Sequence, residues 1–233
     1  MKSITRRASA RLFLYGVEMN FYYMFGLQRS GTNFLEHLLK NNYSARKRNA
    51  TSSAWKHSVN DPTSGWQKKL PQLIIYKNPY TWIESVATRN KVDWLKTQKT
   101  YPADEDIDND LQVGENSFNV VNLAKTYRDF HTNWLDREDL PLYKAIKYED
   151  LLDDTKRYRI LLALNTDFGW AKPPNDRFKI PSKGGVSQSK DYSDEREQYY
   201  IQARPKVLTH KQITAINEYV GVDLITKMGY EVL

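Results

Sequence analysis

The fold is decided by residues 20–39, which read NFYYMFGLQRSGTNFLEHLL. Residues 20–27 form an aromatic and apolar run, which predicts a buried strand. The polar sequence QRSGT interrupts this run at residues 28–32, and apolar residues then recur at helical spacing over residues 33–39. The stretch therefore predicts a strand, a tight loop and a helix in direct succession.

The rest of the chain continues this alternation of strands and helices. Further strands are expected at residues 53–59, 72–76 and 143–148, where β-branched and aromatic residues cluster. Helices are expected at residues 80–89, 118–135, 149–164, 194–203 and 209–220. The acidic stretch at residues 94–114 predicts an insertion or lid, and residues 171–193 predict a long loop. Such alternation predicts an α/β fold: a three-layer sandwich with a central, mostly parallel sheet flanked by helices.

Length and composition limit the possible classes of protein. The 233 residues suit one domain at 19–233, and the basic residues 1–18 are expected to be a dispensable extension because Met19 directly precedes the first strand. The chain has no cysteine, which excludes disulfides, thiolate catalysis and zinc–thiolate sites. No apolar stretch approaches the roughly 20 residues of a membrane span, and a cytoplasmic location is expected. The net charge of +7 indicates either a basic surface or a polyanionic ligand.

The loop at residues 26–33 carries groups suited to phosphate binding. Its glycines allow backbone N–H groups to point at a phosphate, and the following helix N-terminus adds a favourable dipole. Ser30, Thr32 and Asn33 can donate hydrogen bonds, and Arg29 can neutralise charge. The loop nearly matches the P-loop pattern, but Thr32 occupies the lysine position, which argues against an NTPase. A serine–glycine turn that simply caps a helix is the plainer alternative.

The loop has a more specific resemblance. FGLQRSGTNFLEHLL at residues 25–39 resembles the 5′-phosphosulfate-binding loop of the sulfotransferase superfamily that uses 3′-phosphoadenosine 5′-phosphosulfate (PAPS). In that family a strand runs into [KR]-S-G-T-[TN] and then a helix. The resemblance implies a P-loop NTPase-like sulfotransferase fold. It also implies that the 5′-phosphosulfate is held by Arg29, Ser30, Gly31, Thr32 and Asn33.

Two later segments extend the resemblance. The family binds the nucleotide 3′-phosphate with a basic residue, usually Arg, and a Ser eight positions later; Lys77 and Ser85 have this spacing. Lysine keeps the charge but lacks the bidentate fork of arginine. YEDLL at residues 148–152 resembles a recurrent family segment, for which we expect a structural role, with its acidic residues favouring a helix N-terminus. Lys183 is the nearest counterpart of a late R-K-G element, although the arginine is missing.

A candidate catalytic base lies between the two phosphate segments. By resemblance, His57 would take the proton from the acceptor, Lys56 would steady the sulfuryl oxygens, and Arg29 would follow the charge on the leaving group. In the cytosolic family members the lysine and histidine are two positions apart. Here they are adjacent, so either the strand ends at Lys56 or only one of them enters the site. Glu36 and Asp61 remain alternative bases.

The resemblance implies an enzyme that moves the sulfuryl group of PAPS to a hydroxyl or amine and releases 3′-phosphoadenosine 5′-phosphate (PAP). Cationic side chains would stabilise the charge, and no metal is expected; the four histidines show no metal-ligand spacing. Small-molecule, carbohydrate and lipid acceptors, as well as phenols and peptides, stay open, as does the oligomeric state. The alternatives are a nucleotide or small-molecule kinase, which needs ATP and Mg²⁺, and a non-catalytic nucleic-acid-binding protein with salt-sensitive affinity.

Overall fold

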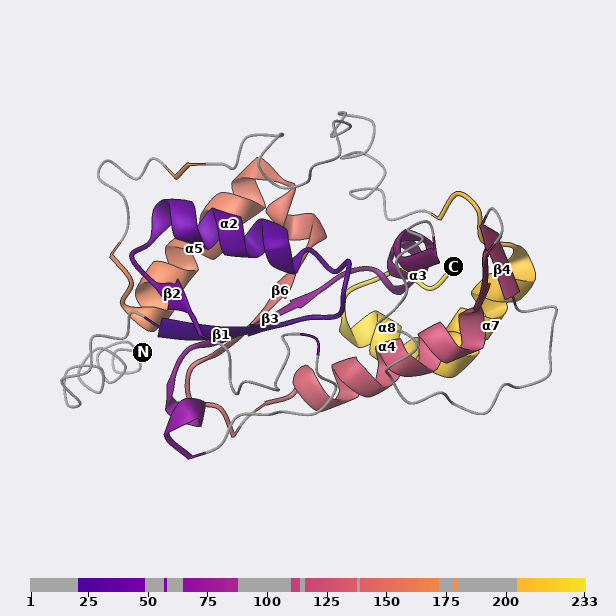
Figure 1. The fold of residues 1–233 in the computed structure, drawn as a ribbon, viewed down its shortest axis with the longest axis horizontal. Helices are drawn as coiled ribbons and strands as arrows, with labels where there is room; N and C mark the ends of the chain where they lie inside the picture. Colours follow the sequence, from indigo (N-terminus) through magenta and orange to yellow (C-terminus); the bar gives the residue numbers. More distant parts are fainter. Residues whose placement is uncertain are drawn as a thin grey trace, which may run out of the picture.

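The computed structural model describes residues 21–48, 57, 65–87, 110–113, 116–137, 139–171, 178–179 and 205–233. Its centre is a four-stranded sheet in the order β2-β1-β3-β6, in which all neighbouring strands are parallel (Figure 1). The strands are β1 (Phe21–Phe25), β2 (Arg46–Lys47), β3 (Gln72–Tyr76) and β6 (Tyr143–Lys147). The strands expected at residues 20–27, 72–76 and 143–148 are therefore confirmed.

The order of the strands creates a switch point between β1 and β3. The chain leaves β1 through helix α2 (Thr32–Asn42) and enters β2 on one side of β1. It then returns to pair β3 with the other side of β1, with Phe25 opposite Ile74. In open parallel sheets, ligands bind beyond the carboxyl ends of the strands at such a point. The loop after β1 and the residues after β3 both lie at this edge.

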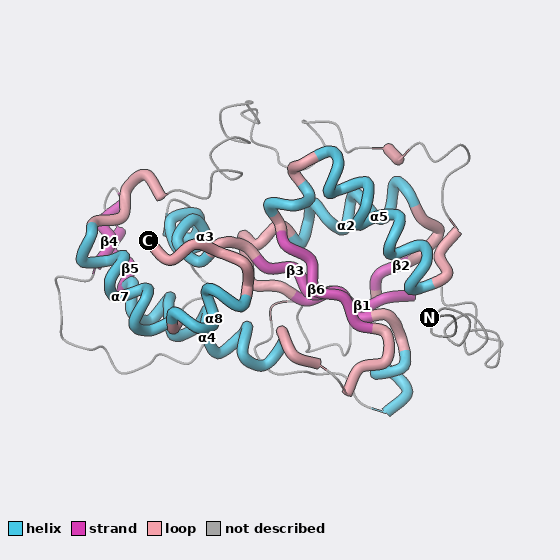
Figure 2. The backbone as a smooth tube through the Cα atoms, turned by 180° about the vertical axis from the view of Figure 1, so that it is seen from behind, coloured by secondary structure: helices cyan, strands magenta, loops and turns pink. Residues whose placement is uncertain are grey.

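Helices cover both faces of the sheet (Figure 2). Because alternate residues of a strand face opposite sides, Tyr23 and Phe25 join one hydrophobic cluster and Tyr22 and Met24 the other. The Tyr22 face is covered by α2 and by α5 (Asp154–Phe168). The Tyr23 face is covered by α3 (Pro79–Ala87), α4 (Val120–Trp134), α7 (His210–Val220) and α8 (Val222–Lys227). Burial on both faces explains why β1 reads as a continuous apolar run.

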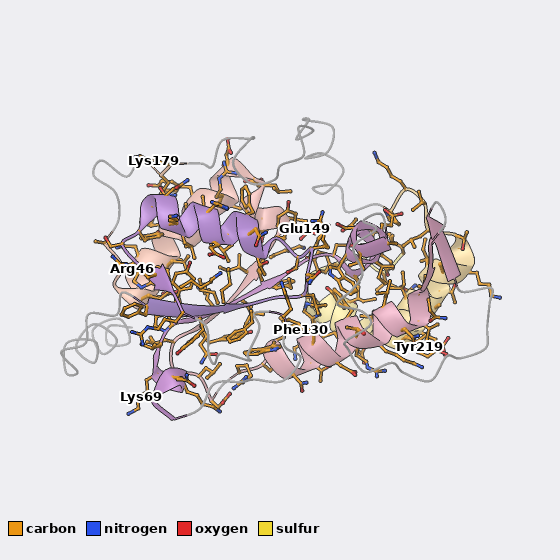
Figure 3. The ribbon with its side chains drawn as sticks, viewed as in Figure 1. Arg46, Lys69, Phe130, Glu149, Lys179 and Tyr219 are labelled. Carbon is orange, nitrogen blue, oxygen red and sulfur yellow. The ribbon has the colours of Figure 1, made fainter. Side chains whose placement is uncertain are left out.

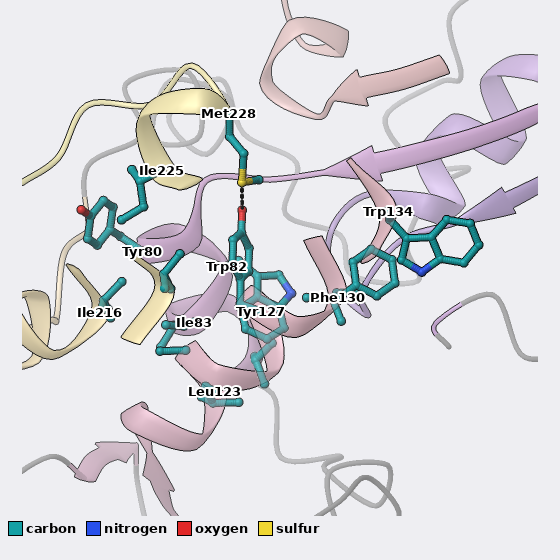
Figure 4. Close-up of a cluster of buried hydrophobic side chains, with 14 of the residues drawn as sticks. Tyr80, Trp82, Ile83, Leu123, Tyr127, Phe130, Trp134, Ile216, Ile225 and Met228 are labelled. Carbon is teal, nitrogen blue, oxygen red and sulfur yellow. Dashed lines mark hydrogen bonds between the residues drawn. The ribbon is translucent and has the colours of Figure 1, made fainter. Parts of the chain in front are cut away.

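The cluster on the Tyr23 face is rich in aromatic side chains (Figure 4). Trp134 stacks on Phe25, with ring centroids 4.3 Å apart, and so fixes α4 against the sheet. The hydroxyl group of Tyr127, also on α4, contacts the sulfur of Met228 at 3.6 Å. Burial of each such side chain stabilises the fold by about 1.5–3 kcal/mol. The packing holds α3 and α4 in place beside the carboxyl end of β3.

Most predicted helices have the observed boundaries to within a few residues. The helices expected at residues 33–39, 80–89, 118–135 and 209–220 are confirmed as α2, α3, α4 and α7. Thr209 caps α7 through a capping box with Gln212. The helix expected at residues 149–164 begins later. A 3₁₀ turn at Glu149–Leu151 comes first, and the Asp153 carboxylate then caps α5 by accepting from the Lys156 N–H at 2.8 Å.

Other elements differ from the expectation or were not foreseen. The second strand of the sheet is the two-residue β2; of residues 53–59 only residue 57 is described, and it lies in a turn. The strands β4 (Asp110–Val113) and β5 (Asn116–Asn119) form an antiparallel pair at the end of the expected acidic insertion. The short helix α8 and the 3₁₀ helix Gly65–Lys69 had no clear signal in the sequence.

Several expectations fall outside the described residues. They are the extension at residues 1–18, most of the acidic insertion, the loop at residues 180–193 and the helix at residues 194–203. Within the part of the chain that the structure describes, no helix combines the length and apolar character that a membrane span requires.

Candidate functional site

The loop after β1, here called the glycine loop (residues 26–33), has an alternating backbone conformation. Arg29 and Gly31 have positive φ angles of 67° and 98°, whereas Ser30 between them does not. Such alternation turns successive N–H groups toward one concave side, which is how backbone nests hold anions. Ser30 closes the turn, because both its N–H (3.1 Å) and its hydroxyl (2.6 Å) donate to the Leu27 carbonyl. Ser30 would therefore have to rotate its hydroxyl to reach a ligand.

Close contacts require glycine at two positions of the glycine loop. A Cβ atom at Gly26 would lie 2.6 Å from Cγ2 and 2.7 Å from the carbonyl oxygen of Ile75, on β3. A Cβ atom at Gly31 would lie 2.2 Å from Cδ2 of Tyr148, which follows β6. The glycine loop is therefore packed against the carboxyl end of β3 and against the residue that follows β6.

The N-terminus of α2 forms the end of the glycine loop. Gly31 is the N-cap residue; it provides no side-chain cap, and the first turn holds no acidic residue. The positive end of the helix dipole is therefore available to an anion at this place. Thr32 is buried and Asn33 is exposed at the start of the helix.

Lys77 lies directly after β3 and is almost completely buried, with 1% of its surface exposed. Its ammonium nitrogen lies 5.8 Å from the centre of the Tyr148 ring, the same ring that packs on Gly31. Its backbone carbonyl accepts a hydrogen bond from the Tyr127 hydroxyl at 2.5 Å. One aromatic ring thus packs on the glycine loop and lies within cation–π range of the lysine at the tip of the adjacent strand.

The helix after Lys77 is tied to the glycine loop. Asn78 caps α3, since its side-chain oxygen accepts from the N–H groups of Tyr80 (3.0 Å) and Thr81 (3.2 Å). The Trp82 indole N–H donates to the Gln28 carbonyl at 2.7 Å. Ser85, one turn further along α3, is buried. The structure therefore brings the segment with Lys77 and Ser85 against the glycine loop.

His57 is buried beneath the first residue of this loop, with 4% of its surface exposed. Its Nδ1 atom is hydrogen-bonded to the Gly26 carbonyl oxygen. Because a carbonyl only accepts, Nδ1 carries the proton, and Nε2 is the basic nitrogen of the neutral ring. This is the tautomer that a general base requires.

The other residues named as candidates have different positions. Lys56, Asp61 and Lys183 lie outside the described residues. Glu36, on α2, forms an ion pair with Lys47 at the end of β2. Its carboxylate therefore has a structural partner of opposite charge.

Glu149 is placed differently from the expectation. It does not support the N-terminus of a long helix, because α5 begins only at Asp154. Instead its buried carboxylate accepts from the Asn78 N–H at 3.0 Å and from the Tyr230 hydroxyl at 2.7 Å; Figure 3 labels the position of Glu149. Burial raises the pKa of the Glu149 carboxyl above its ordinary value. The two hydrogen bonds and the positive charge of Lys77 oppose this increase.

Sequence reasoning missed four aromatic residues that shape the site. Each contacts the glycine loop or the tip of β3 or β6, and they are Trp82, Tyr127, Tyr148 and Tyr230. In a chain with 16 tyrosines and 6 tryptophans, such residues look like ordinary core. Only Tyr148 carried a signal, because it opens the segment YEDLL.

The described residues contain no group of three His, Asp or Glu side chains placed to hold a metal ion. What they do bring together is cationic and N–H-bearing groups at the carboxyl ends of two adjacent parallel strands. This arrangement suits an anion with more than one phosphate-like group. No family model, curated protein or solved structure matches the chain.

Proposed function

We propose that this chain is a PAPS-dependent sulfotransferase, which moves a sulfuryl group from PAPS to a hydroxyl or amine. The observation that carries the proposal is the shared contact at Tyr148. Its ring packs on Gly31 of the glycine loop and lies 5.8 Å from the Lys77 ammonium. Two candidate anion sites thus lie side by side at the switch point of a parallel sheet, where one nucleotide could occupy both.

In this proposal the two sites hold the two ends of the nucleotide. Arg29, Gly31, Thr32, Asn33 and a rotated Ser30 would hold the 5′-phosphosulfate. Lys77 and Ser85 would hold the 3′-phosphate, and Lys183 would add a further cation. A phosphate dianion next to the buried Lys77 ammonium would add to the negative charge that Glu149 already provides. The P-loop NTPase-like sulfotransferase fold is part of the same proposal.

The chemical step would be an in-line transfer. Nε2 of His57 would accept the proton of the acceptor group as its oxygen or nitrogen forms a bond to sulfur. The bond between sulfur and the bridging oxygen of the 5′-phosphate would break, and PAP would leave with the electron pair. Arg29 and the N-terminus of α2 would stabilise the charge on the leaving phosphate, as in loose phosphoryl transfer. Lys56 would contact the sulfuryl oxygens.

A nucleotide-binding experiment tests the first half of the proposal. With chelator present and no metal, PAP at about 100 times its dissociation constant should stabilise the fold by about 2.7 kcal/mol, measured as a rise in melting temperature. Stabilisation by Mg·ATP and not by PAP would favour a kinase instead. Affinity for DNA or RNA that falls steeply with salt, without any effect of PAP, would favour a nucleic-acid-binding protein.

A transfer experiment tests the second half. Labelled PAPS should donate its sulfuryl group to a member of one acceptor class among carbohydrates, lipids, phenols and peptides. His57→Ala should then lose turnover by a factor of about 100 or more while it still binds PAP. His210→Ala, at the exposed start of α7, is the matched control and should keep full turnover. Full turnover of His57→Ala would remove His57 from the role of base.

A further inference from the structure

The last described residues of the chain lie across the tips of β3 and β6. We call residues 229–233 the closing segment. The Gly229 carbonyl accepts from the ammonium group of Lys147, the last residue of β6, at 2.8 Å. The same ammonium group lies 3.8 Å from the centre of the Tyr230 ring. At the other end, the Leu233 N–H donates to the Tyr80 hydroxyl at 3.2 Å. The closing segment is therefore fixed to β6 and to α3.

A buried carboxylate connects the closing segment to the tip of β3. The Tyr230 hydroxyl donates to one oxygen of Glu149 at 2.7 Å, and the Asn78 N–H donates to the other at 3.0 Å. Tyr230 and Glu149 are 6% and 7% exposed, so little water competes for these hydrogen bonds. Asn78 directly follows Lys77, whose carbonyl is held by Tyr127. Hydrogen bonds on both sides thus fix the backbone that carries the buried ammonium.

The attraction between the Glu149 carboxylate and the Lys77 ammonium gives the hydrogen bond from Tyr230 to Glu149 a function beyond packing. Glu149 attracts the charge of Lys77, so a carboxylate free to turn would compete with a bound phosphate for the same ammonium. The Tyr230 hydroxyl and the Asn78 amide engage one carboxylate oxygen each and hold Glu149 in its present orientation. Among the described residues, Tyr76, Tyr127 and Lys147 also interact electrostatically with Glu149 or Tyr230, and the two tyrosines stay neutral because burial raises their pKa.

We propose that Tyr230 and Glu149 are positioning residues for the nucleotide 3′-phosphate. They keep the Asn78 amide and the Lys77 ammonium in the arrangement that favours a 3′-phosphorylated nucleotide over its unphosphorylated counterpart. The inference rests on the proposed function and adds to it a role for the closing segment. A purely structural Tyr230 would affect stability but not the choice between the two nucleotides.

The experiment compares PAP with adenosine 5′-monophosphate (AMP), which lacks only the 3′-phosphate. Dissociation constants are measured by titration calorimetry for the wild-type chain and for Tyr230→Phe, which removes one hydroxyl. The variant should bind PAP about tenfold more weakly and AMP within about twofold of the wild type. The matched control is Tyr158→Phe, since Tyr158 lies on α5 on the other face of the sheet, is 42% exposed and packs on Phe178. It should change neither constant.

Two further results would overturn the inference in distinguishable ways. If Tyr230→Phe weakens the binding of PAP and of AMP equally, or weakens neither, the positioning role is rejected and the proposed function still stands. A wild-type chain that binds PAP no better than AMP would reject both. If Tyr230→Phe does not fold, Glu149→Asp takes its place, because it keeps the negative charge while its shorter side chain can no longer reach both the Tyr230 hydroxyl and the Asn78 N–H. It should lower the PAP-to-AMP preference as well, and an unchanged preference would reject the inference.

Discussion

Gly31→Ala perturbs the glycine loop at the point where it contacts Tyr148. The new Cβ atom would lie 2.2 Å from Cδ2 and 2.6 Å from Cε2 of the Tyr148 ring, distances far inside van der Waals contact. The φ angle of +98° adds a second penalty, because L-residues rarely adopt it. The ring lies between the glycine loop and Lys77, so it cannot move without disturbing the candidate site.

Both penalties can be given a magnitude. A left-handed conformation costs a residue with a Cβ atom about 1–2 kcal/mol, and overpacking costs about 1–3 kcal/mol. The free energy of unfolding should therefore fall by about 2–5 kcal/mol. Gly169→Ala is the matched control: its φ angle is +68°, but no atom of the described residues lies within 4 Å of the new Cβ. The free energy of unfolding of that variant should fall only by the cost of the left-handed conformation, about 1–2 kcal/mol.

Urea denaturation measures these differences directly. A double variant, Gly31→Ala with Tyr148→Leu, should recover the overpacking part, so the two substitutions should be coupled by about 1–3 kcal/mol. The single variant should also lose PAP binding. If Gly31→Ala costs no more than Gly169→Ala and shows no coupling to Tyr148, the ring does not pack on the glycine loop, and the shared contact that supports the proposed function is refuted.

Two further predictions concern α3 and α4. Trp82→Phe removes the hydrogen bond to the Gln28 carbonyl. The free energy of unfolding should therefore fall by about 1 kcal/mol, and titration calorimetry should show weaker PAP binding. Unchanged PAP affinity would mean that α3 does not hold the glycine loop. Burial lowers the pKa of His131 from 6.5 to about 3 in the folded chain. The unfolded state therefore binds a proton at this histidine more readily than the folded state does. As a result, the free energy of unfolding should fall by about 2 kcal/mol from pH 7 to pH 5. Chemical denaturation across this range should show that slope in the wild type and in the His210→Gln control but not in His131→Gln; an identical slope in all three would contradict the assignment.

The sequence predicted the elements whose signals are local. The apolar run before the glycine loop and the β-branched cluster at residues 72–76 each identify a strand buried on both faces. The two-residue strand β2 was missed because it is too short to show any periodicity. The helix expected from Glu149 starts at Asp154, because the three residues from Glu149 form a 3₁₀ turn that fits the tip of β6.

The candidate site was predictable only in part, because its contacts connect residues far apart in the chain. Gly31 and Lys77 were identified as candidates from their own motifs, but the Tyr148 ring that joins them is on a later element. The hydrogen bond from Tyr230 to Glu149 spans 81 positions. No spacing rule covers such a distance, because the packing of α7 and α8 against the sheet brings the closing segment to the tip of β6. The acceptor site has no comparable signal in the sequence.

Whether one nucleotide occupies both anion sites can be decided by a crystal structure of the chain with PAP in the presence of chelator. We expect the 5′-phosphate against the backbone N–H groups of residues 29–33. The 3′-phosphate should lie at hydrogen-bonding distance, about 3 Å, from Nζ of Lys77. PAP bound elsewhere, or bound with its 3′-phosphate in solvent and away from Lys77, would show that the two sites do not hold one nucleotide.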